Sequence, residues 1–244
     1  MKNQVALVSG GTSGIGKATV IKLLEDGFLV ATFAPKAEKC KALAKELAQA
    51  FEPQQFLVVP GDVKKEASLK QVVAATVKKF KTIDVLLNNA GYGFYTEPDA
   101  VDIAKYEDMI QVNVVGMAAL TKLVVLQMKK RKSGLIINVA SIAGREVGFK
   151  GSFYSSTKFA VMGYSAGIRK DLAPFGIKVA TVCPGMVWTN FFDQKELRRR
   201  RKELWGGKQP VMLQPQDIAQ AVSFICRQPA QVQIQDMLIM PFGN

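Results

Sequence analysis

The sequence contains no histidine, and its three cysteines, Cys40, Cys183 and Cys226, lie far apart. The lack of histidine excludes a His-based catalytic triad and a His general base. No Cys-x-x-Cys pair occurs, so we expect neither a metal site nor a disulfide framework, and a reducing cytoplasm fits. Any acid/base chemistry must therefore use tyrosine, lysine, cysteine or a carboxylate.

Long apolar runs are also missing. No apolar stretch reaches the ~18 residues that a membrane span needs, and the short apolar run near the N-terminus ends in glycines, unlike a signal peptide. We therefore expect a cytoplasmic protein without a membrane segment. The 244 residues, 48% of them hydrophobic, suffice for one α/β domain spanning 1–244.

The net charge of +13 favours anionic partners in general, such as phosphates, acidic carrier proteins, nucleic acid or a membrane surface. Charge alone does not choose among these. The basic run 129–132 ends a long helical pattern, where cations oppose the negative end of the helix dipole. We favour this structural interpretation over a nucleic-acid patch, and we expect neither a nucleic-acid nor a membrane partner.

Short apolar runs alternate with helical patterns along the chain. This alternation predicts a Rossmann-type, doubly wound α/β fold, with a mainly parallel sheet of seven strands and helices on both faces. Ligands of such sheets lie outside the carboxyl ends of the strands. Five marked residues fall at or just past the end of a predicted strand: Gly10, Asp62, Asn89, Ser141 and Pro184. Strands are predicted over 4–9, 28–33, 56–59, 135–139, 177–183 and 237–240, and 84–91 is predicted as a strand that runs into a polar, glycine-ended turn. Helices are predicted over 17–26, 36–51, 66–80, 106–132, 153–173 and 216–227.

A glycine-rich turn, Gly10 to Gly16, follows the first predicted strand and precedes the first helix. Glycines let the backbone approach a pyrophosphate closely, and a helix N-terminus favours negative charge. The glycines at 10, 14 and 16 are more widely spaced than in the common G-x-G-x-x-G motif. In this context the turn predicts a phosphate site.

Tyr154 and Lys158 lie one helical turn apart on the same face of a predicted helix. A tyrosine has a free pKa of about 10, and a nearby cation lowers that pKa by favouring the phenolate. Ser141, from a separate segment, would hold a carbonyl oxygen beside the phenol. Together they predict a site that interconverts C=O and CH–OH, given a hydride donor. A Tyr-x-x-x-Lys pair alone is usually an ordinary surface pair.

These residues resemble the short-chain dehydrogenase/reductase family across essentially the whole chain. The matching motifs are Gly10-x-x-x-Gly14-Ile15-Gly16, the run 88–91 (Asn-Asn-Ala-Gly), Asn113, the triplet Ser141, Tyr154 and Lys158, and the run 184–189 (Pro-Gly-Met-Val-Trp-Thr). Each motif is modest alone, but all of them in order are specific. The resemblance implies a hydride-transferring oxidoreductase.

The resemblance also implies roles for individual residues. Tyr154 would be the general acid in reduction and the general base in oxidation. Lys158 would lower the pKa of Tyr154 and bind the nicotinamide ribose, Ser141 would orient the substrate oxygen, and Asn113 would hold a water that links Lys158 to solvent. The implied cofactor-binding residues are Gly10, Thr12, Ser13, Gly14, Ile15, Gly16, Lys36, Asp62, Val63, Asn89, Ala90, Gly91, Tyr154, Lys158, Pro184, Gly185, Val187 and Thr189.

Cofactor choice follows from the end of the second predicted strand. Ala34 stands where the family's NAD-selecting Asp would be. The missing charge removes repulsion of a 2′-phosphate, and Lys36 supplies attraction, so we expect NADP(H) to be favoured over NAD(H). Lys36 as a solvated lysine and Asp62 as a simple turn-former are the alternative interpretations.

The segment of about 190–215 falls where the family carries a substrate lid. Between Asp193 and Glu203 it holds six basic and three acidic residues. One hypothesis is that this lid receives an acidic or carrier-bound acyl thioester; the other is a solvated helix face. Five aromatic residues lie near the site by sequence and indicate either an apolar pocket or core: Tyr92, Phe94, Tyr95, Phe149 and Phe153.

We therefore predict an NADP(H)-dependent enzyme that acts on a small-molecule carbonyl or alcohol, such as a carbonyl or 3-oxoacyl-thioester reductase. The alternative is a catalytically idle NADP-binding sensor or scaffold, against which the intact catalytic residues argue. A nucleic-acid-binding protein is suggested only by the charge. The family implies a homodimer or homotetramer, although the ending 235–244 departs from the family's common one. The sequence identifies neither the substrate nor the direction of the reaction.

Overall fold

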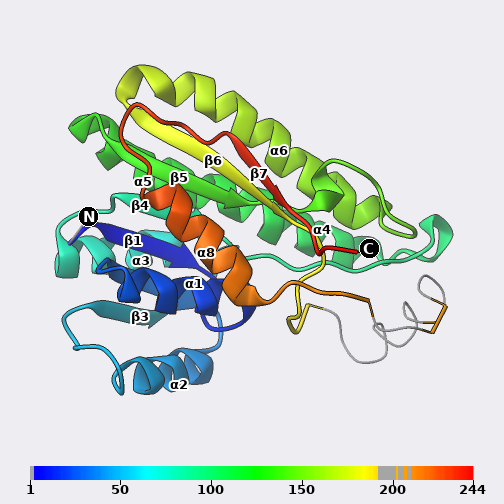
Figure 1. The fold of residues 1–244 in the computed structure, drawn as a ribbon, viewed down its shortest axis with the longest axis horizontal. Helices are drawn as coiled ribbons and strands as arrows, with labels where there is room; N and C mark the ends of the chain where they lie inside the picture. The colour runs from blue at the N-terminus through cyan, green and yellow to red at the C-terminus, as the bar shows by residue number, and fades with distance from the viewer. Residues whose placement is uncertain (1–2, 192–201, 203–205, 208–209, 244) are drawn as a thin grey trace.

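The computed structural model describes residues 3–191, 202, 206–207 and 210–243. A single parallel sheet of seven strands, in the order β3-β2-β1-β4-β5-β6-β7, forms its centre (Figure 1). The predicted fold class is thereby confirmed. The strands are β1 (Val5–Ser9), β2 (Leu29–Ala34), β3 (Phe56–Pro60), β4 (Val85–Asn88), β5 (Gly134–Val139), β6 (Ile177–Pro184) and β7 (Asp236–Ile239).

Helices cover both faces of the sheet (Figure 1). The period-2 geometry of a strand sends alternate side chains to opposite faces. In β1, Ala6 and Val8 join the core under α1, α2 and α8, whereas Val5 and Leu7 join the core under α3, α5 and α6. The helices are α1 (Gly14–Glu25), α2 (Ala37–Leu47), α3 (Glu66–Phe80), α4 (Ile103–Ile110), α5 (Met117–Arg131), α6 (Ser152–Leu172) and α8 (Pro215–Cys226).

The strand order reverses between β1 and β4, which are hydrogen-bonded neighbours although two strands separate them in the chain. Connections leave β1 and β4 toward opposite sides of this pair. Such a reversal leaves a crevice at the carboxyl ends of the strands, where α/β sheets bind ligands. The fold thus places the ends of β1, β2, β4, β5 and β6 around one opening.

The helix from 103 to 131 is interrupted by a π-helical segment, η2 (Gln111–Gly116). By length and composition this helix reaches the requirement for a membrane span, which corrects the expectation that no apolar stretch does so. Its buried side chains Leu120, Val124 and Met128 belong to the core packed on the sheet. The apolar character is therefore that of a core helix.

The basic run at the end of α5 makes contacts that suit a helix terminus. Arg131 donates a hydrogen bond of 2.8 Å to the carbonyl of Ile83, and Lys129 Nζ lies 4.2 Å from the ring centroid of Phe175. Lys132 is the left-handed residue that ends the helix. These contacts agree with the structural interpretation of the run.

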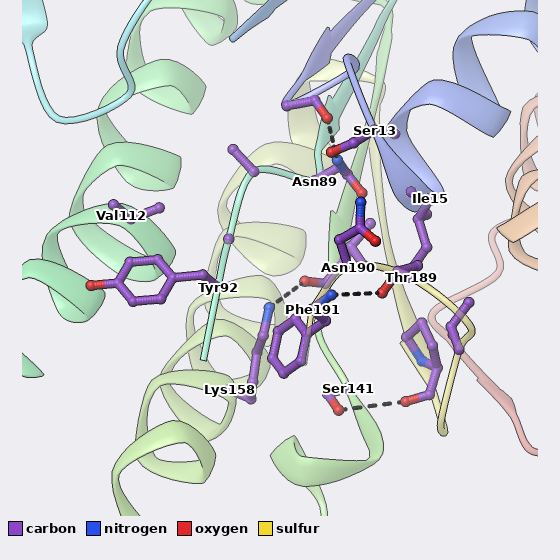
Figure 2. Close-up of a pocket in the computed structure, with 18 of the residues that line it drawn as sticks. Ser13, Ile15, Asn89, Tyr92, Val112, Ser141, Lys158, Thr189, Asn190 and Phe191 are labelled. Atoms are coloured by element: carbon purple, nitrogen blue, oxygen red, sulfur yellow. Dashed lines mark hydrogen bonds between the residues drawn. The ribbon is translucent and has the colours of Figure 1, made fainter. Parts of the chain in front are cut away.

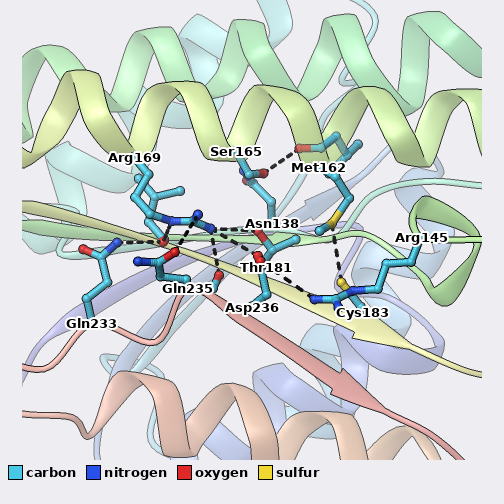
Figure 3. A network of polar contacts seen from close by, with 12 residues as sticks. Asn138, Arg145, Met162, Ser165, Arg169, Thr181, Cys183, Gln233, Gln235 and Asp236 are labelled. Carbon is cyan, nitrogen blue, oxygen red and sulfur yellow. Dashed lines mark hydrogen bonds and ion pairs between the residues drawn. The ribbon is translucent and has the colours of Figure 1, made fainter.

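A polar network attaches the last strand to the rest of the sheet (Figure 3). Arg169 of α6 donates to the carbonyls of Val179 at 3.0 Å and Gln235 at 2.8 Å. Its guanidinium also pairs with the Asp236 carboxylate at 3.2 Å, and Arg145 reaches the same carboxylate at 3.8 Å. The strand β7 and the segment that follows Ser141 therefore share one anchor.

Candidate active site

A cavity of about 720 Å³ lies at the carboxyl ends of the strands (Figure 2). Every cofactor-binding position expected from the sequence lines it, and so does Ser141. Asn113 is the only predicted site residue that does not line the cavity. The cavity brings together segments from nearly the whole length of the chain, from Gly10 to Phe191.

The glycine turn between β1 and α1 requires its glycines. Gly10 and Gly14 have φ of 70° and 52°, which L side chains rarely adopt. A Cβ on Gly16 would lie 2.4 Å from both Asn89 Nδ2 and the Gly10 carbonyl oxygen. The N-cap residue Ser13 makes no side-chain cap, and the first turn of α1 carries no acidic residue. Its N–H groups therefore suit a phosphate.

Side-chain hydrogen bonds lock this turn to the end of β4. Asn89 Nδ2 donates to the carbonyl oxygens of Ser9 at 3.0 Å and Gly10 at 3.3 Å. Ser9 Oγ accepts from the backbone N–H groups of Asn89 and Ala90, each at 3.0 Å. The asparagine of the 88–91 motif thus shapes the turn.

At the end of β2 the cavity is bordered by cations. Ala34, the last strand residue, is buried, whereas Lys36 and Lys39 are exposed and line the cavity. The cavity-lining residues of 33–39 include no carboxylate. Lys39 was missed by the sequence analysis, although its position one helical turn after Lys36 was a usable signal.

Asp62 and Val63 line the cavity beyond β3. Asp62 Oδ1 accepts a 3.0 Å hydrogen bond from the backbone N–H of Lys64. Asp62 is therefore a turn-former, as the alternative interpretation held, and it also faces the cavity. The two interpretations of this residue are compatible.

The proposed catalytic side chains meet where β5, β6 and α6 converge. Tyr154 and Lys158 are each 6% exposed. Lys158 Nζ donates to the Val139 carbonyl at 3.0 Å and lies 5.8 Å from the ring centroid of Tyr154. Ser141 Oγ accepts from Ala143 N at 3.1 Å and donates to the Pro184 carbonyl at 3.5 Å. Ser141 and Lys158 face the same cavity (Figure 2).

Burial dominates the protonation of these groups. It raises the pKa of Tyr154 above its ordinary value, Tyr95 raises it further, and the Ser141 hydroxyl lowers it. The net direction is upward in this structure because desolvation outweighs the other influences, and the expected lowering of the Tyr154 pKa by Lys158 stays a prediction. Burial also lowers the pKa of Lys158 to about 8. At neutral pH the tyrosine is the protonated acid.

Asn113 lies in the π-helical segment η2 and uses its amide on the protein. Its Nδ2 donates to the Tyr92 carbonyl at 2.8 Å and to Thr157 Oγ1 at 3.0 Å, and its Oδ1 accepts from Tyr92 N at 3.0 Å. A Cβ on Gly91 would lie 3.0 Å from Asn113 Oδ1 and 3.7 Å from Lys158 Nζ. Asn113 thus holds the loop after β4 against α6, beside Lys158. Its water-holding role stays a prediction.

Aromatic rings surround the ring of Tyr154. The ring centroid of Tyr95 lies 5.7 Å from it and that of Phe191 lies 5.3 Å from it. Phe94 and Phe153 pack against the same cluster of buried residues as these rings, but they do not line the cavity. The side chain of Phe149 is 56% exposed. Phe191 and the cavity-lining Glu146 were not identified as site residues from the sequence, since no motif marks them.

The predicted substrate lid is only partly visible. Asn190 and Phe191, at its start, line the cavity. Most of its basic run, 195–201, lies outside the described residues, and Lys202 is described and exposed. In the part of the chain that the structure describes, no group of three or more His, Cys, Asp or Glu residues is arranged to hold a metal ion.

Comparison with known proteins agrees with this geometry. The model of a family described as short chain dehydrogenase matches residues 4–200. The chain belongs to this family. It is 32% identical over 241 residues to an uncharacterized oxidoreductase of Staphylococcus aureus, covering 99% of this chain and 98% of the relative. This short-chain dehydrogenase is accordingly an oxidoreductase.

Two solved structures of the family resemble it closely in fold. A serine dehydrogenase complexed with NADP+ has a TM-score of 0.87 at 29% identity, covering 99% of this chain and 96% of the other. A 3-ketoacyl-(acyl-carrier-protein) reductase from Brucella melitensis, complexed with NADH, has a TM-score of 0.85 at 26% identity, covering 98% and 97%. The similarity supports a nicotinamide cofactor without choosing between its two forms.

Proposed function

We propose that this short-chain dehydrogenase is an NADP(H)-dependent carbonyl reductase, working mainly in the direction of ketone reduction. One observation carries the proposal. Ser141, Tyr154 and Lys158 lie at one end of a cavity whose other end holds the glycine turn and two lysines. The proton donor and the proposed dinucleotide site would thus share one cavity.

The glycine turn leaves room for a dinucleotide. Side chains at its glycine positions would occupy the space beside the turn that the cofactor needs. A Cβ on Gly14 would lie 3.1 Å from Thr189 Cγ2, so the turn and the loop after β6 close on the same space. The implied residues of the glycine turn, with Asn89 to Gly91 and Pro184 to Thr189, would hold the cofactor. The nicotinamide, when bound, supplies the hydride.

The preference for NADP(H) rests on charge at the end of β2. A 2′-phosphate there would meet Lys36 and Lys39 and no carboxylate from the cavity-lining residues of 33–39. Charge-assisted hydrogen bonds from lysine to phosphate are stronger than neutral ones. An NAD site presents a carboxylate to the hydroxyls of this ribose. The cavity-lining residues of 33–39 include no carboxylate, so NAD(H) would lack that contact here.

The chain's own groups then perform the proton transfer. Ser141 Oγ orients the carbonyl oxygen, and Tyr154 Oη donates its proton to that oxygen. The phenolate left on Tyr154 is stabilised by Lys158, which is largely protonated at neutral pH because its pKa is about 8. Reprotonation from solvent passes through Lys158, beside which Asn113 lies.

Two alternatives to the reduction of a free ketone predict different experimental results. A catalytically idle sensor would bind NADPH without turnover, although it would not need the intact triplet. The other alternative is the reduction of a carrier-bound 3-oxoacyl thioester, which has some support from the similarity to the Brucella reductase and from the basic run of the lid. We also propose that 190–215 covers the substrate.

The assembly and location follow the same family logic. We propose a cytoplasmic homodimer or homotetramer, supported by apolar residues exposed on the two long helices, Leu126 at 61% and Phe159 at 45%. Exposed apolar side chains on helices are common at subunit interfaces. Sedimentation of the pure protein measures the assembly directly, and a monomer at micromolar concentration would contradict it.

A panel of carbonyl compounds tests the function. NADPH oxidation is followed by absorbance with neutral ketones, 2-oxo acids and a 3-oxoacyl thioester, and each assay is repeated with NADH and with Tyr154→Phe. We expect turnover of at least one carbonyl, a preference for NADPH, and a loss of roughly 100- to 10,000-fold in Tyr154→Phe. NADPH binding without turnover of any carbonyl would favour the idle sensor.

A further inference from the structure

The substrate end of the cavity consists of aromatic and uncharged surfaces. Its described lining comes from residues 92–95, 141–154 and 186–191, and Glu146 is the only charged side chain among them. Lys158 also lines the cavity beside Tyr154, and its buried amine donates to the Val139 carbonyl at 3.0 Å. A carboxylate on the substrate would therefore find no described cation at this end other than Lys158, whose amine is already bonded to the Val139 carbonyl, and it would face Glu146. Burying an unpaired charge is costly.

Two aromatic rings, those of Tyr95 and Phe191, pack against glycines beside the proton donor Tyr154. A Cβ on Gly93 would lie 2.5 Å from Tyr154 Cδ2 and 2.7 Å from Phe191 Cζ, and a Cβ on Gly151 would lie 3.2 Å from Tyr95 Cε1. The missing side chains let both rings approach Tyr154, at interplanar angles of 62° for Phe191 and 50° for Tyr95. Any carbonyl that takes a proton from Tyr154 must lie beside these rings.

We infer that the substrate is an uncharged ketone that carries an aromatic group, and that Tyr95 and Phe191 are the residues that select it. Tilted and edge-to-face ring pairs are favourable beyond the area they bury, and a flat substituent preserves such contacts with both rings. This inference rests on the proposed function and names its substrate class. Phe191 stands at the start of the predicted lid and lines the cavity.

The test uses four ketones that differ in two features only: pyruvate, methyl pyruvate, benzoylformate and methyl benzoylformate. The pairs change methyl to phenyl at constant charge, or carboxylate to ester at constant ring. With NADPH we expect the wild-type kcat/KM for methyl benzoylformate to exceed that for each of the others at least about tenfold. Equal values, or a preference for any of the other three ketones, would overturn the inference.

Variants assign the selection to the two rings. Phe191→Leu and Tyr95→Leu are expected to reduce the phenyl-to-methyl ratio about fivefold or more, whereas Phe224→Leu, at an exposed position of α8 outside the cavity lining, leaves it unchanged. Glu146→Gln is expected to raise kcat/KM for benzoylformate several-fold. NADPH binding by fluorescence confirms that each variant is folded. A ratio that both leucine variants preserve would overturn the role of the rings.

A binding measurement separates this inference from the proposed function. Tyr154→Phe keeps the ring but lacks the proton donor, so saturation-transfer NMR with NADPH reports substrate recognition without turnover. We expect a signal from methyl benzoylformate and a weaker one from benzoylformate. No binding of the ester overturns the inference whatever the activity. Binding of the ester without turnover of any carbonyl by the wild type overturns the proposed function alone.

Discussion

The two ends of the active-site cavity are held by different kinds of contact. At the nucleotide end, glycines and side-chain hydrogen bonds to backbone atoms fix the turn after β1, with Asn89 bonded to two carbonyls. At the substrate end, rings pack against the ring of Tyr154. Directional bonds fix the position of one constant ligand, whereas ring packing tolerates changes in shape. Substitutions at the two ends should therefore separate cofactor binding from substrate turnover.

The largest effect on cofactor affinity is expected at the nucleotide end, from Gly16→Ala. The new methyl group would lie 2.4 Å from Asn89 Nδ2 and the Gly10 carbonyl oxygen, and overpacking costs about 1–3 kcal/mol. We expect NADPH affinity, measured by fluorescence titration, to fall by roughly 10- to 100-fold. Gly163→Ala in α6, where a Cβ meets nothing within 4 Å, is the matched control. Equal affinities in the two variants would break the comparison.

Substitution of Lys158, which lies between the two ends, measures how much the burial of its charge destabilises the folded protein. Its pKa is about 8 in the folded protein against an ordinary 10.5, so burying the charge destabilises the fold. We expect Lys158→Met to raise the free energy of unfolding at pH 7 by about 1–3 kcal/mol while it abolishes activity.

The pH dependence of this effect has a definite sign. Between pH 8 and 10.5 the unfolded wild type binds more protons at Lys158 than the folded state does, so wild-type stability rises with pH through that window. The difference in the free energy of unfolding between Lys158→Met and the wild type, measured by urea denaturation, should therefore shrink as the pH rises. An advantage that stays constant from pH 7 to 10 would show that burial of the charge is not its cause.

At the substrate end, Gly93→Ala should reduce turnover without weakening the cofactor. Its Cβ would lie 2.5 Å from Tyr154 Cδ2 and 2.7 Å from Phe191 Cζ, which displaces the two rings. We expect kcat/KM for methyl benzoylformate to fall about tenfold, in line with about 1.4 kcal/mol of strain, and NADPH affinity to stay within twofold. Gly167→Ala, with open space around it, serves as control. A matching loss of NADPH affinity would mean that the ends are not independent.

The smallest effect is expected from Lys36→Ala. The side chain is exposed, so its interaction with a 2′-phosphate is screened by solvent. We expect the NADPH-to-NADH ratio of kcat/KM to fall about three- to tenfold, and further in the double variant with Lys39→Ala. Lys41→Ala, on the same helix but outside the cavity lining, should leave the ratio unchanged. An unchanged ratio in Lys36→Ala would remove the physical basis of the NADP(H) preference.

The glycine turn at the nucleotide end was predictable from the sequence because its contacts demand one residue type at one spacing. Gly10 needs its positive φ, and Gly16 needs to have no side chain. Strand ends such as Ser141 and Pro184 could be placed together because the alternation of strands and helices fixes the sheet. The short-chain dehydrogenase family and the fold were both expected and are both confirmed.

The substrate end was less predictable, for physical reasons. Ring contacts such as Phe191 against Tyr154 join segments 37 positions apart with no fixed motif. Glu146 has no sequence signal at all. The direction of the Tyr154 pKa depended on burial, which the spacing of Tyr154 and Lys158 does not encode. The π-helical turn that carries Asn113 likewise left no periodic trace.

The central claim, that Tyr154 gives a proton to a carbonyl while the nicotinamide gives a hydride, is tested most directly with NADPH deuterated at the transferred position of C4. The wild type and Tyr154→Phe are incubated with methyl benzoylformate, and deuterium at the carbinol carbon of the product is measured by NMR. We predict deuterium at that carbon with the wild type, and formation slowed by roughly 100- to 10,000-fold in Tyr154→Phe. A product without deuterium, or an undiminished rate in Tyr154→Phe, would contradict the claim.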